Sequence, residues 1–214
     1  MRILRRHEMT SLLLQKMLLP VTDLLDQNIA LLTELDSATG DGDHGVTIGK
    51  ISKKIRTCVN ELSGNEEITG VLDDLSWDLM NINGGSAGPL WGAFFEGMAT
   101  GAGQECISDD QLIKNILIEG YSNFSVVSKA NAGEKTMMDA IYPATEVLRL
   151  ENGSIKEVAN KMASAALAGA RDTTNMIAKY GRAKSLKEKS LGHEDPGAVS
   201  FSLFYVGIAE GLNE

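Results

Sequence analysis

The sequence predicts an all-α fold, and three observations carry that prediction. Apolar residues recur with helical spacing through most of the 214 residues. No stretch alternates apolar and polar residues for long enough to form a strand, and no hairpin turn lies between β-branched runs. The connections between the periodic stretches are mostly short, which makes neighbouring helices antiparallel. We therefore expect one domain over residues 1–214, a barrel or bundle of about eight antiparallel amphipathic helices, with residues 1–8 disordered.

The helices follow from the apolar spacing in chain order. The first two are predicted over 10–19 and 21–35, with a boundary at Pro20. The next are 45–63, 67–82, 87–101, 112–124, 137–150, 155–170 and 197–212. The clearest is 155–170, in which the apolar positions have no misses: Ile155, Val158, Ala159, Met162, Ala163, Ala166, Leu167 and Ala170. Asn152-Gly153 is expected to form the turn before it.

Composition excludes several classes of protein. Hydrophobic residues make up 43% of the chain and charged residues 23%, which is typical of a globular domain. The formal charge of −9 argues against a nucleic-acid or anionic-membrane surface. Cys58 and Cys106 provide neither a disulfide framework nor a zinc spacing. The apolar stretch 12–19 is too short to span a bilayer and lacks a cleavage site. We expect a cytoplasmic protein that binds no nucleic acid and no membrane.

Three aspartates lie within eight residues, in the glycine-rich connection 36–45. Asp36, Asp41 and Asp43 would repel one another unless a cation lay among them, and oxygen ligands favour Mg²⁺, Mn²⁺ or Ca²⁺. A calcium-binding EF-hand needs Glu at position 12 of its loop, where this chain has Ser52 or Thr47, depending on the starting aspartate. A helix cap would explain Asp43 but not all three. The pattern therefore predicts a magnesium site, with Asp36, Asp41 and Asp43 as ligands.

Three more connections, 83–88, 125–136 and 178–196, are rich in glycine or polar residues. Alternate loops of an antiparallel bundle share one end, so these and 36–45 would meet there if they alternate. In the first, Ser86 is a candidate N-cap, with Pro89 in the first helical turn. Its glycines leave N–H groups open to a phosphate, but glycines also allow close helix packing, and both interpretations stay open.

The other two connections contain cap signals and candidate phosphate ligands. Gly133-Glu134-Lys135-Thr136 is not a P-loop, because Glu134 interrupts the required Gly-Lys pair. Thr136 is expected to cap a helix starting at Met137, with Asp139 completing the pattern. Asp195 is expected to be an N-cap, with Pro196 at the first helical position. Arg182 is either a phosphate ligand or a solvated side chain, and His44 could reach a carboxylate or a phosphate.

Taken together and in order, these motifs resemble a known family, the nucleotide-binding L subunits of dihydroxyacetone kinases. The motifs are Asp36 with Gly40-Asp41-Gly42-Asp43-His44-Gly45, Gly84-Gly85-Ser86-Ala87-Gly88-Pro89-Leu90, Gly133-Glu134-Lys135-Thr136-Met137-Met138-Asp139-Ala140, and Gly181-Arg182-Ala183 with Gly192-His193-Glu194-Asp195-Pro196-Gly197-Ala198. The resemblance covers residues 10–212. It implies a barrel of eight antiparallel helices with the nucleotide site at one end.

The resemblance also implies a site and a reaction. The three aspartates would hold two Mg²⁺ ions on the phosphates of ADP or ATP. Arg182 and His44 would be the catalytic residues. The nucleotide-binding residues would be His44, Gly45, Val46, Thr47, Ser86, Ala87, Gly88, Ser128, Thr136, Met137, Arg182, Asp195, Pro196 and Gly197. Met137 would lie near the adenine. The donor would be ATP, or ADP recharged by a phosphoprotein of the phosphotransferase system (an M subunit).

The acceptor in this family is a hydroxyketone bound covalently to a separate K subunit, which would be the main partner; a homodimer is a further expectation. The chain departs from the family pattern at Ala87, at Ser128 and over 184–189, where it lacks an aromatic residue and a glycine of that pattern and gains lysines. Two other interpretations follow from these departures: a subunit of a kinase for another keto-sugar such as erythrulose, and a nucleotide-bound regulatory module without transfer activity. A plain helical scaffold is the weakest.

Overall fold

The computed structural model describes residues 10–106 and 108–214, and its regular structure there is entirely helical. The helices are α1 (Ser11–Gln27), α2 (Ile29–Thr39), α3 (His44–Asn60), α4 (Ile68–Met80), α5 (Ala87–Ala102), α6 (Asp109–Ser128), α7 (Met138–Leu150), α8 (Ile155–Asp172) and α9 (Pro196–Asn213), with short 3-10 segments η1 (Thr173–Asn175) and η2 (Arg182–Ser190) before α9. The all-α prediction is confirmed. The expected disorder of residues 1–8 lies outside the described residues.

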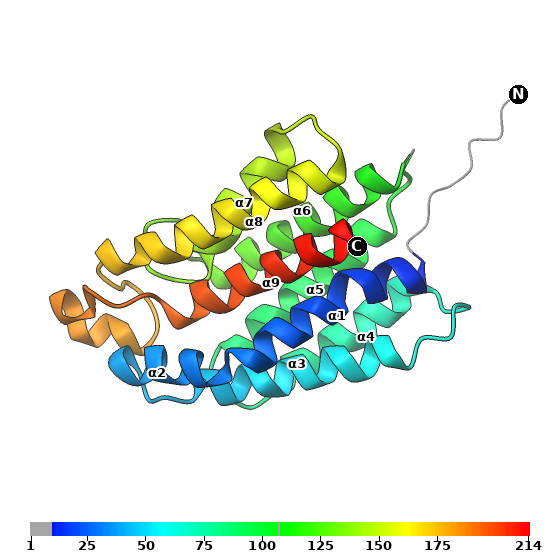
Figure 1. Cartoon of the computed structure of the whole chain (residues 1–214). Helices are drawn as coiled ribbons and strands as arrows, with labels where there is room; N and C mark the ends of the chain where they lie inside the picture. The colour runs from blue at the N-terminus through cyan, green and yellow to red at the C-terminus, as the bar shows by residue number, and fades with distance from the viewer. Residues whose placement is uncertain (1–9, 107) are drawn as a thin grey trace, which may run out of the picture.

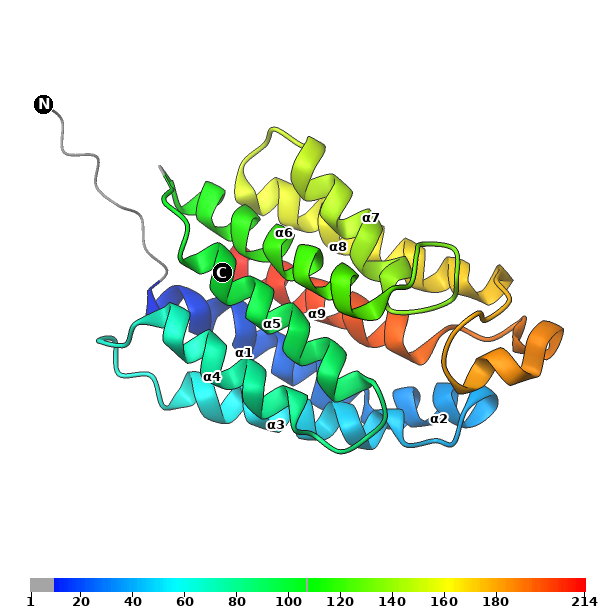
Figure 2. The same ribbon diagram turned by 180° about the vertical axis from the view of Figure 1, so that it is seen from behind.

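Eight of these helices form a closed ring (Figure 1). In chain order, α1, α3, α4, α5, α6, α7, α8 and α9 each pack against the next, and α9 returns to pack against α1. The remaining helix, α2, is a short extension at one end that packs on α3. Successive helices of the ring run in opposite directions, as the view from behind also shows (Figure 2). The expected barrel of eight antiparallel helices is therefore confirmed, with one further helix at its end.

The four longer connections share one end of the ring. The α2–α3, α4–α5, α6–α7 and α8–α9 connections all lie at the left of Figure 1, where α2 also contacts η2. Because each helix reverses direction, alternate connections must return to the same end. The expectation that they meet is confirmed, and it places the candidate residues together.

The centre of the barrel is filled by aromatic side chains from α5 and α9. Trp91 stacks on Phe201 with ring centroids 4.4 Å apart, and Phe94 and Phe204 meet edge to face at 5.3 Å. All four side chains are fully buried. α5 and α9 are the most apolar helices that the structure describes, so they bury most of their circumference and supply the aromatic side chains at the centre of the ring.

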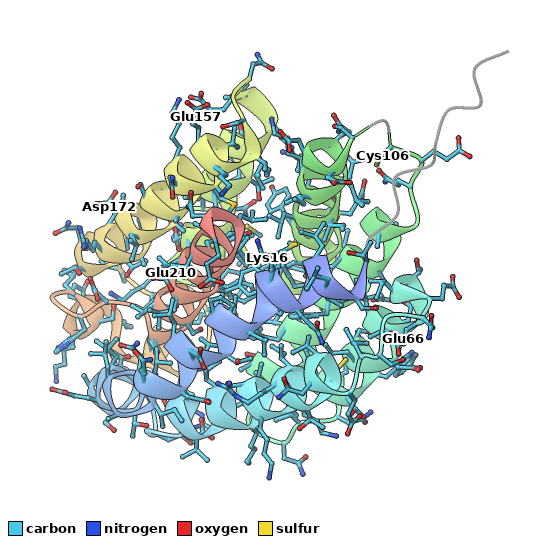
Figure 3. All side chains as sticks on the ribbon, turned by 45° about the vertical axis from the view of Figure 1, so that its right-hand side comes forward. Lys16, Glu66, Cys106, Glu157, Asp172 and Glu210 are labelled. Atoms are coloured by element: carbon cyan, nitrogen blue, oxygen red, sulfur yellow. The ribbon has the colours of Figure 1, made fainter. Side chains whose placement is uncertain are left out.

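The predicted helix boundary at Pro20 is wrong, because α1 runs through Pro20 and ends at Gln27. Proline has no N–H, so the carbonyl of Lys16, four residues earlier, loses its helical donor. That carbonyl lies directly against Gly211 of α9, where a Cβ would have no room. Figure 3 shows the two helices meeting there, with Lys16 and Glu210 labelled. Gly211 leaves room for this carbonyl, so α9 packs closely on α1 while the helix continues through the proline.

The same arrangement occurs on α7. Pro143 lies inside that helix, and the carbonyl that it leaves without a helical donor is that of Asp139. This carbonyl lies against Gly169 of α8, again with no room for a Cβ. In both cases the carbonyl that a proline leaves without a helical donor faces a glycine on a neighbouring helix, and the two backbones approach more closely than other residues would allow.

Two further boundaries differ from the prediction. α2 continues to Thr39, because the N–H of Gly40 donates to the carbonyl of Asp36 and closes a last turn, so Asp36 lies in a helix and not in a loop. α6 continues to Ser128 and shortens the expected connection 125–136. Over the described residues, no helix combines the length and the apolar character needed to cross a bilayer.

Candidate functional site

A cavity of about 630 Å³ lies where the four connections meet. Each of the four connections contributes to its wall. It is lined by thirteen of the residues proposed from the sequence: Asp36, Asp41, Asp43, His44, Ser86, Ala87, Ser128, Thr136, Met137, Arg182, Asp195, Pro196 and Gly197. The structure thus brings together residues that are up to 161 positions apart in the sequence (197 − 36). The volume of the cavity is typical of a site for a small molecule, for which about 300–1,000 Å³ is usual.

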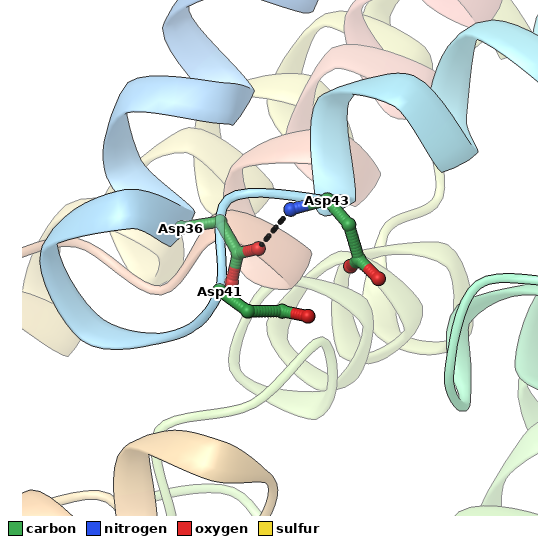
Figure 4. Close-up of side chains that lie close together, drawn as sticks. All are labelled: Asp36, Asp41 and Asp43. Atoms are coloured by element: carbon green, nitrogen blue, oxygen red, sulfur yellow. Dashed lines mark hydrogen bonds between the residues drawn. The ribbon is translucent and has the colours of Figure 1, made fainter.

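The three aspartates converge at one side of this cavity (Figure 4). Asp36 lies in the last turn of α2, Asp41 lies in the α2–α3 connection, and Asp43 directly precedes α3. One carboxylate oxygen from each lies within 4.8 Å of those of the other two. The donor set consists of carboxylate oxygens, as a hard divalent cation prefers. The grouping expected from the sequence therefore fits a magnesium site.

Asp36 is held in place by the start of α3. Its Oδ2 accepts hydrogen bonds from the backbone N–H groups of Asp43, at 2.9 Å, and His44, at 3.1 Å. A carboxylate at a helix N-terminus satisfies open N–H groups and interacts favourably with the helix dipole. Asp36 therefore caps α3, while Asp43 makes no cap hydrogen bond of its own. The other oxygen, Oδ1, lies against Gly40, where a Cβ would collide with it.

Arg182 supplies the positive charge that faces these carboxylates. It lies at the start of η2, forms an ion pair with Asp41, and its Nη1 is 4.0 Å from Asp43 Oδ2. The three side chains are about half exposed, so this pairing contributes little stability. It does show that η2 delivers a cation to the acidic side of the cavity. A guanidinium there can also face the oxygens of a phosphate.

His44 lines the cavity but is mostly buried, at 8% exposed. Its Nε2 lies 3.1 Å from Ser200 Oγ on α9. Burial lowers the pKa of His44 to about 4, although Asp36 and a hydrogen bond with the Pro196 backbone act in the opposite direction. The ring is therefore neutral at pH 7 and joins the start of α3 to the start of α9. This favours a positioning role over a charged contact to phosphate.

The glycine-rich turn before α5 combines both roles that the sequence left open. Gly85 has a φ of 66° and nothing near its Cβ position, so its backbone is open to the cavity. Gly84 lies against Thr47 of α3, and Gly88 lies against the carbonyls of Leu79 and Ile82. The turn is thus close-packed on one side and open on the other. Ser86 occupies the N-cap position without a side-chain cap bond, which leaves the N-terminus of α5 to an anion.

The turn before α7 is built around Asp139. This buried carboxylate accepts hydrogen bonds from the N–H groups of Gly133, at 2.5 Å, and Thr136, at 2.8 Å. Thr136 Oγ1 accepts in turn from the N–H of Met138, so Thr136 and Asp139 make the expected pair of bonds; α7, however, begins at Met138, and its N-cap position is Met137, which makes no side-chain cap bond. The consequence is a fixed turn that directs Thr136 and Met137 into the cavity.

Asp195 caps α9 as expected. Its Oδ2 accepts from the N–H of Ala198 at 2.8 Å, and Pro196 occupies the first helical position. Burial raises the pKa of Asp195 to about 7 from an ordinary 3.8, although the Ala198 amide and the charge of Lys135 oppose the rise. The protonation of Asp195 therefore changes near neutral pH.

We expect Asp195→Asn to flatten the dependence of stability on pH. The native carboxyl keeps its proton up to about pH 7, whereas in the unfolded chain it loses it near 3.8. The native state therefore binds more protons between these values, and the free energy of unfolding falls as pH rises through them. Asparagine keeps the cap and does not titrate. Melting temperatures of both proteins between pH 4 and 8, without divalent cations, test this.

Comparing Asp195→Asn with wild type separates the effect of Asp195 on the pH dependence of stability from the effect of His44. Because His44 has a lowered pKa, it makes stability rise with pH between about 4 and 6.5, in the wild type and the variant alike. The difference in melting temperature between Asp195→Asn and wild type should therefore grow in favour of the variant as pH increases from 4 to 7. A difference that stays constant over that range would contradict the assignment.

Four of the proposed residues do not line the cavity: Gly45, Val46, Thr47 and Gly88. Gly45 lies against the Ile29 carbonyl and the Thr33 hydroxyl of α2, and Thr47 is buried against Gly84. These two and Gly88 support the walls of the cavity from behind. Val46 is 55% exposed and points away from this packing.

Sequence reasoning missed the apolar part of the wall and one buried lysine. The apolar residues are Leu90, Phe124, Val127, Ala130 and Ala183. Leu90 could have been proposed from the sequence, since it directly follows the glycine-rich turn and Pro89. Lys135 lines the cavity at only 2% exposure, and a lysine in a polar loop gives no sequence signal of burial.

Comparison with known proteins gives a consistent family. A model of the DAK2 domain matches residues 38–210. The ADP-binding subunit DhaL of the PEP-dependent dihydroxyacetone kinase 2 of Listeria innocua is 36% identical over 197 residues, covering 89% of this chain and 90% of that one. The corresponding subunit DhaL of Escherichia coli is 32% identical, covering 90% and 92%.

Longer proteins also match. The L-erythrulose kinase of Pectobacterium atrosepticum is 30% identical over 195 residues; the match covers 89% of this chain but 33% of that enzyme, so the chain spans about a third of its length. The crystal structure of the dihydroxyacetone kinase from C. freundii, in complex with AMP-PNP and Mg²⁺, superposes with a TM-score of 0.72 at 24% identity. That match covers 98% of this chain and 36% of the kinase, and it confirms the fold.

Proposed function

This chain belongs to the DAK2 domain family, and from that premise we propose that it is the nucleotide-binding, phosphoryl-transferring subunit of a dihydroxyacetone-type kinase. The observation that supports this best is the convergence of Asp36, Asp41 and Asp43 on the wall of a cavity that also contains an open helix N-terminus. Phosphoryl transfer requires positioning and charge stabilisation more than covalent help from the protein. Carboxylates that hold a cation, beside N–H groups open to phosphate, supply both.

Each side of the cavity has a role in this proposal. Asp36, Asp41 and Asp43 hold two Mg²⁺ ions, which when bound neutralise and polarise the phosphates of ADP or ATP. The backbone of the Gly85-Ser86-Ala87 turn binds phosphate oxygens through N–H groups. Arg182 faces the charge that develops on the transferred group. Met137, beside the apolar residues of the wall, receives the adenine.

The remaining proposed residues position these groups. Asp36 holds its second oxygen towards the cavity because its first caps α3. His44 joins the start of α3 to α9 as a neutral ring. Asp195, Pro196 and Gly197 form the cap that closes the cavity, where Gly197 lies against Met137. Ser128 and Thr136 lie on the wall next to the nucleotide.

We propose that the acceptor is a hydroxyketone held on a separate K subunit. In support, the subunits DhaL of Listeria innocua and Escherichia coli match this chain over about nine-tenths of their length and are named as one subunit of a kinase. Those names also describe ADP binding and dependence on PEP. We infer by analogy that this chain holds ADP that a phosphoprotein of the phosphotransferase system recharges, with free ATP as the other donor to be tested.

A kinase for another keto-sugar is the second candidate, and the match to an L-erythrulose kinase favours it. Residues 184–189 of η2 follow Arg182 and Ala183, and compared with the family pattern they lack an aromatic residue and a glycine and gain lysines. These differences lie next to the cavity, where they can alter which acceptor is reached. A regulatory module without transfer activity is the third candidate.

A mixing experiment separates these candidates. The purified chain, Mg²⁺ and a K subunit from a related kinase are incubated with dihydroxyacetone or erythrulose, and with either ATP or ADP plus the phosphorylated phosphotransferase proteins. We expect phosphorylated sugar only when Mg²⁺ and the K subunit are both present. Bound nucleotide with no product in any mixture would support the regulatory module, and mass analysis that finds no bound nucleotide under any condition would overturn the proposal.

A further inference from the structure

Lys135 is a buried lysine that the proposed reaction does not use. Its side chain is 2% exposed, and its backbone lies in the left-handed region at φ 60°. Its Nζ donates to two backbone carbonyls, that of Thr173 at 2.6 Å and that of His193 at 2.5 Å. A buried ammonium with two carbonyl acceptors costs much less than an unpaired one. The left-handed backbone, fixed by the turn around Asp139, directs the side chain to these acceptors.

The two carbonyls that Lys135 binds lie on either side of one segment. Residues 174–192, here called the lid segment, run from η1 to just before the cap of α9 and contain η2. Thr173 directly precedes this segment and His193 directly follows it. One ammonium group therefore joins the two ends of a nineteen-residue segment. Further bonds complete this closure: Gly192 donates to the Thr174 carbonyl, and Asp195 donates to the Thr173 hydroxyl, both at 2.9 Å.

The lid segment carries the cation that faces the aspartates. Tyr180, Gly181, Arg182 and Ala183 line the cavity, and Arg182 pairs with Asp41. The segment is also joined to the turn that contains Lys135: Lys179 N donates to the Glu134 carbonyl at 3.2 Å, and the Tyr180 hydroxyl donates to the Lys129 carbonyl at 3.1 Å. The path from Lys135 to Arg182 is therefore short and made of hydrogen bonds.

We propose that Lys135 is a positioning residue: its ammonium closes the base of the lid segment and thereby fixes where Arg182 stands over the aspartates. The consequence for transfer rests on the proposed function, whereas the closure itself does not. Without the ammonium, the Thr173 carbonyl keeps only the N–H of Met176, at 3.0 Å, and the bridge between Thr173 and His193 is lost, so the lid segment opens more often and Arg182 spends less time at the cavity.

The first test measures the lid segment without nucleotide. Lys135→Met keeps most of the length of the side chain and removes the donor. We expect amide hydrogen exchange at Ala178, Lys179 and Gly192 to become at least about tenfold faster, while exchange in α5 and α9 is unchanged. The matched control is Lys129→Met, in the same turn and also left-handed at φ 56°, but exposed. Equal exchange in the two variants would overturn the proposal, and so would faster exchange throughout the molecule.

The second test separates positioning from general loosening. Lys135→Arg restores charge and donors and should recover most of the exchange protection that Lys135→Met loses. In the transfer assay, Lys135→Met should lower kcat in a protein with Arg182 but have no further effect in an Arg182→Ala background. If kcat of the Lys135→Met, Arg182→Ala double variant is lowered by the product of the two single losses, the proposal that Lys135 acts through Arg182 is overturned. If the proposed reaction itself is wrong, no variant or wild type transfers phosphate, yet the exchange results still decide the closure.

Discussion

Asp41→Ala is expected to abolish phosphoryl transfer, with a loss of at least about a thousandfold. Asp41 is the aspartate that pairs with Arg182, and it supplies one of the three oxygens that lie within 4.8 Å of one another. With two carboxylates left, the site has neither the charge nor the number of ligands to hold magnesium on a polyphosphate. The transfer rate and the Mg²⁺-dependent affinity for ADP should fall together.

The fold should survive this change, because Asp41 lies in a connection and its side chain is 45% exposed. Circular dichroism should therefore give the wild-type melting curve. Asp78→Ala is the matched control: Asp78 is also an exposed aspartate in an ion pair, with Lys54, but it lies on α4 away from the cavity. We expect wild-type transfer from it. Near-normal transfer by a folded Asp41→Ala protein would refute the assignment of the metal ligands.

Trp91→Ala should destabilise the protein by about 3–5 kcal/mol, the range for truncating a buried aromatic residue. Trp91 is fully buried on α5 and stacks on Phe201 of α9. Its loss leaves a large cavity between the two helices that supply the aromatic side chains at the centre of the ring. The cost should fall towards the lower end of the range, because the indole Nε1 is buried without a hydrogen-bond partner and its removal relieves that penalty. Denaturant unfolding followed by circular dichroism measures the change.

The second tryptophan provides the control. Trp77 on α4 is 66% exposed, so Trp77→Ala removes the same atoms without opening a core cavity. We expect its effect to stay within about 0.5 kcal/mol. Trp91→Phe should cost much less than Trp91→Ala, since phenylalanine keeps most of the ring packing and has no unpaired N–H. Equal destabilisation by Trp91→Ala and Trp77→Ala would contradict the packing described for the barrel.

The fold was predictable because its signals are local. The helices from α3 onwards follow from apolar spacing, whereas the helix expected over 21–35 is divided at Asn28 between α1 and α2; the cap at Asp195 follows from a residue type known to cap helices. The shared end of the four connections follows from alternation alone. The continuation of α1 through Pro20 was not predictable, since the glycine that leaves room for the Lys16 carbonyl is Gly211, nearly two hundred residues further along the chain.

The candidate site divides in the same way. Asp36, Asp41 and Asp43 could be found because three like charges in one short segment demand an explanation. The sequence does not predict that Asp36 also caps α3, because the hydrogen bond depends on how the turn between α2 and α3 folds. The burial of Lys135 depends on carbonyls at the two ends of the distant α8–α9 connection, and the neutral state of His44 depends on its burial beside α9. Burial and charge state arise only after tertiary packing.

At two places, a carbonyl that a proline leaves without a helical donor lies against a glycine. These two arrangements limit the order in which the proline and the glycine can be substituted during evolution. While Pro20 is present, position 211 accepts no side chain, because a methyl group would meet the bare carbonyl of Lys16. Replacing the proline restores the missing donor, and position 211 then accepts a side chain only if that carbonyl also moves away from α9. The same sequence of events applies to Pro143 and Gly169. In each pair, therefore, the proline has to be replaced before the glycine can be. As long as both residues remain, the close spacing between the two helices is kept as well.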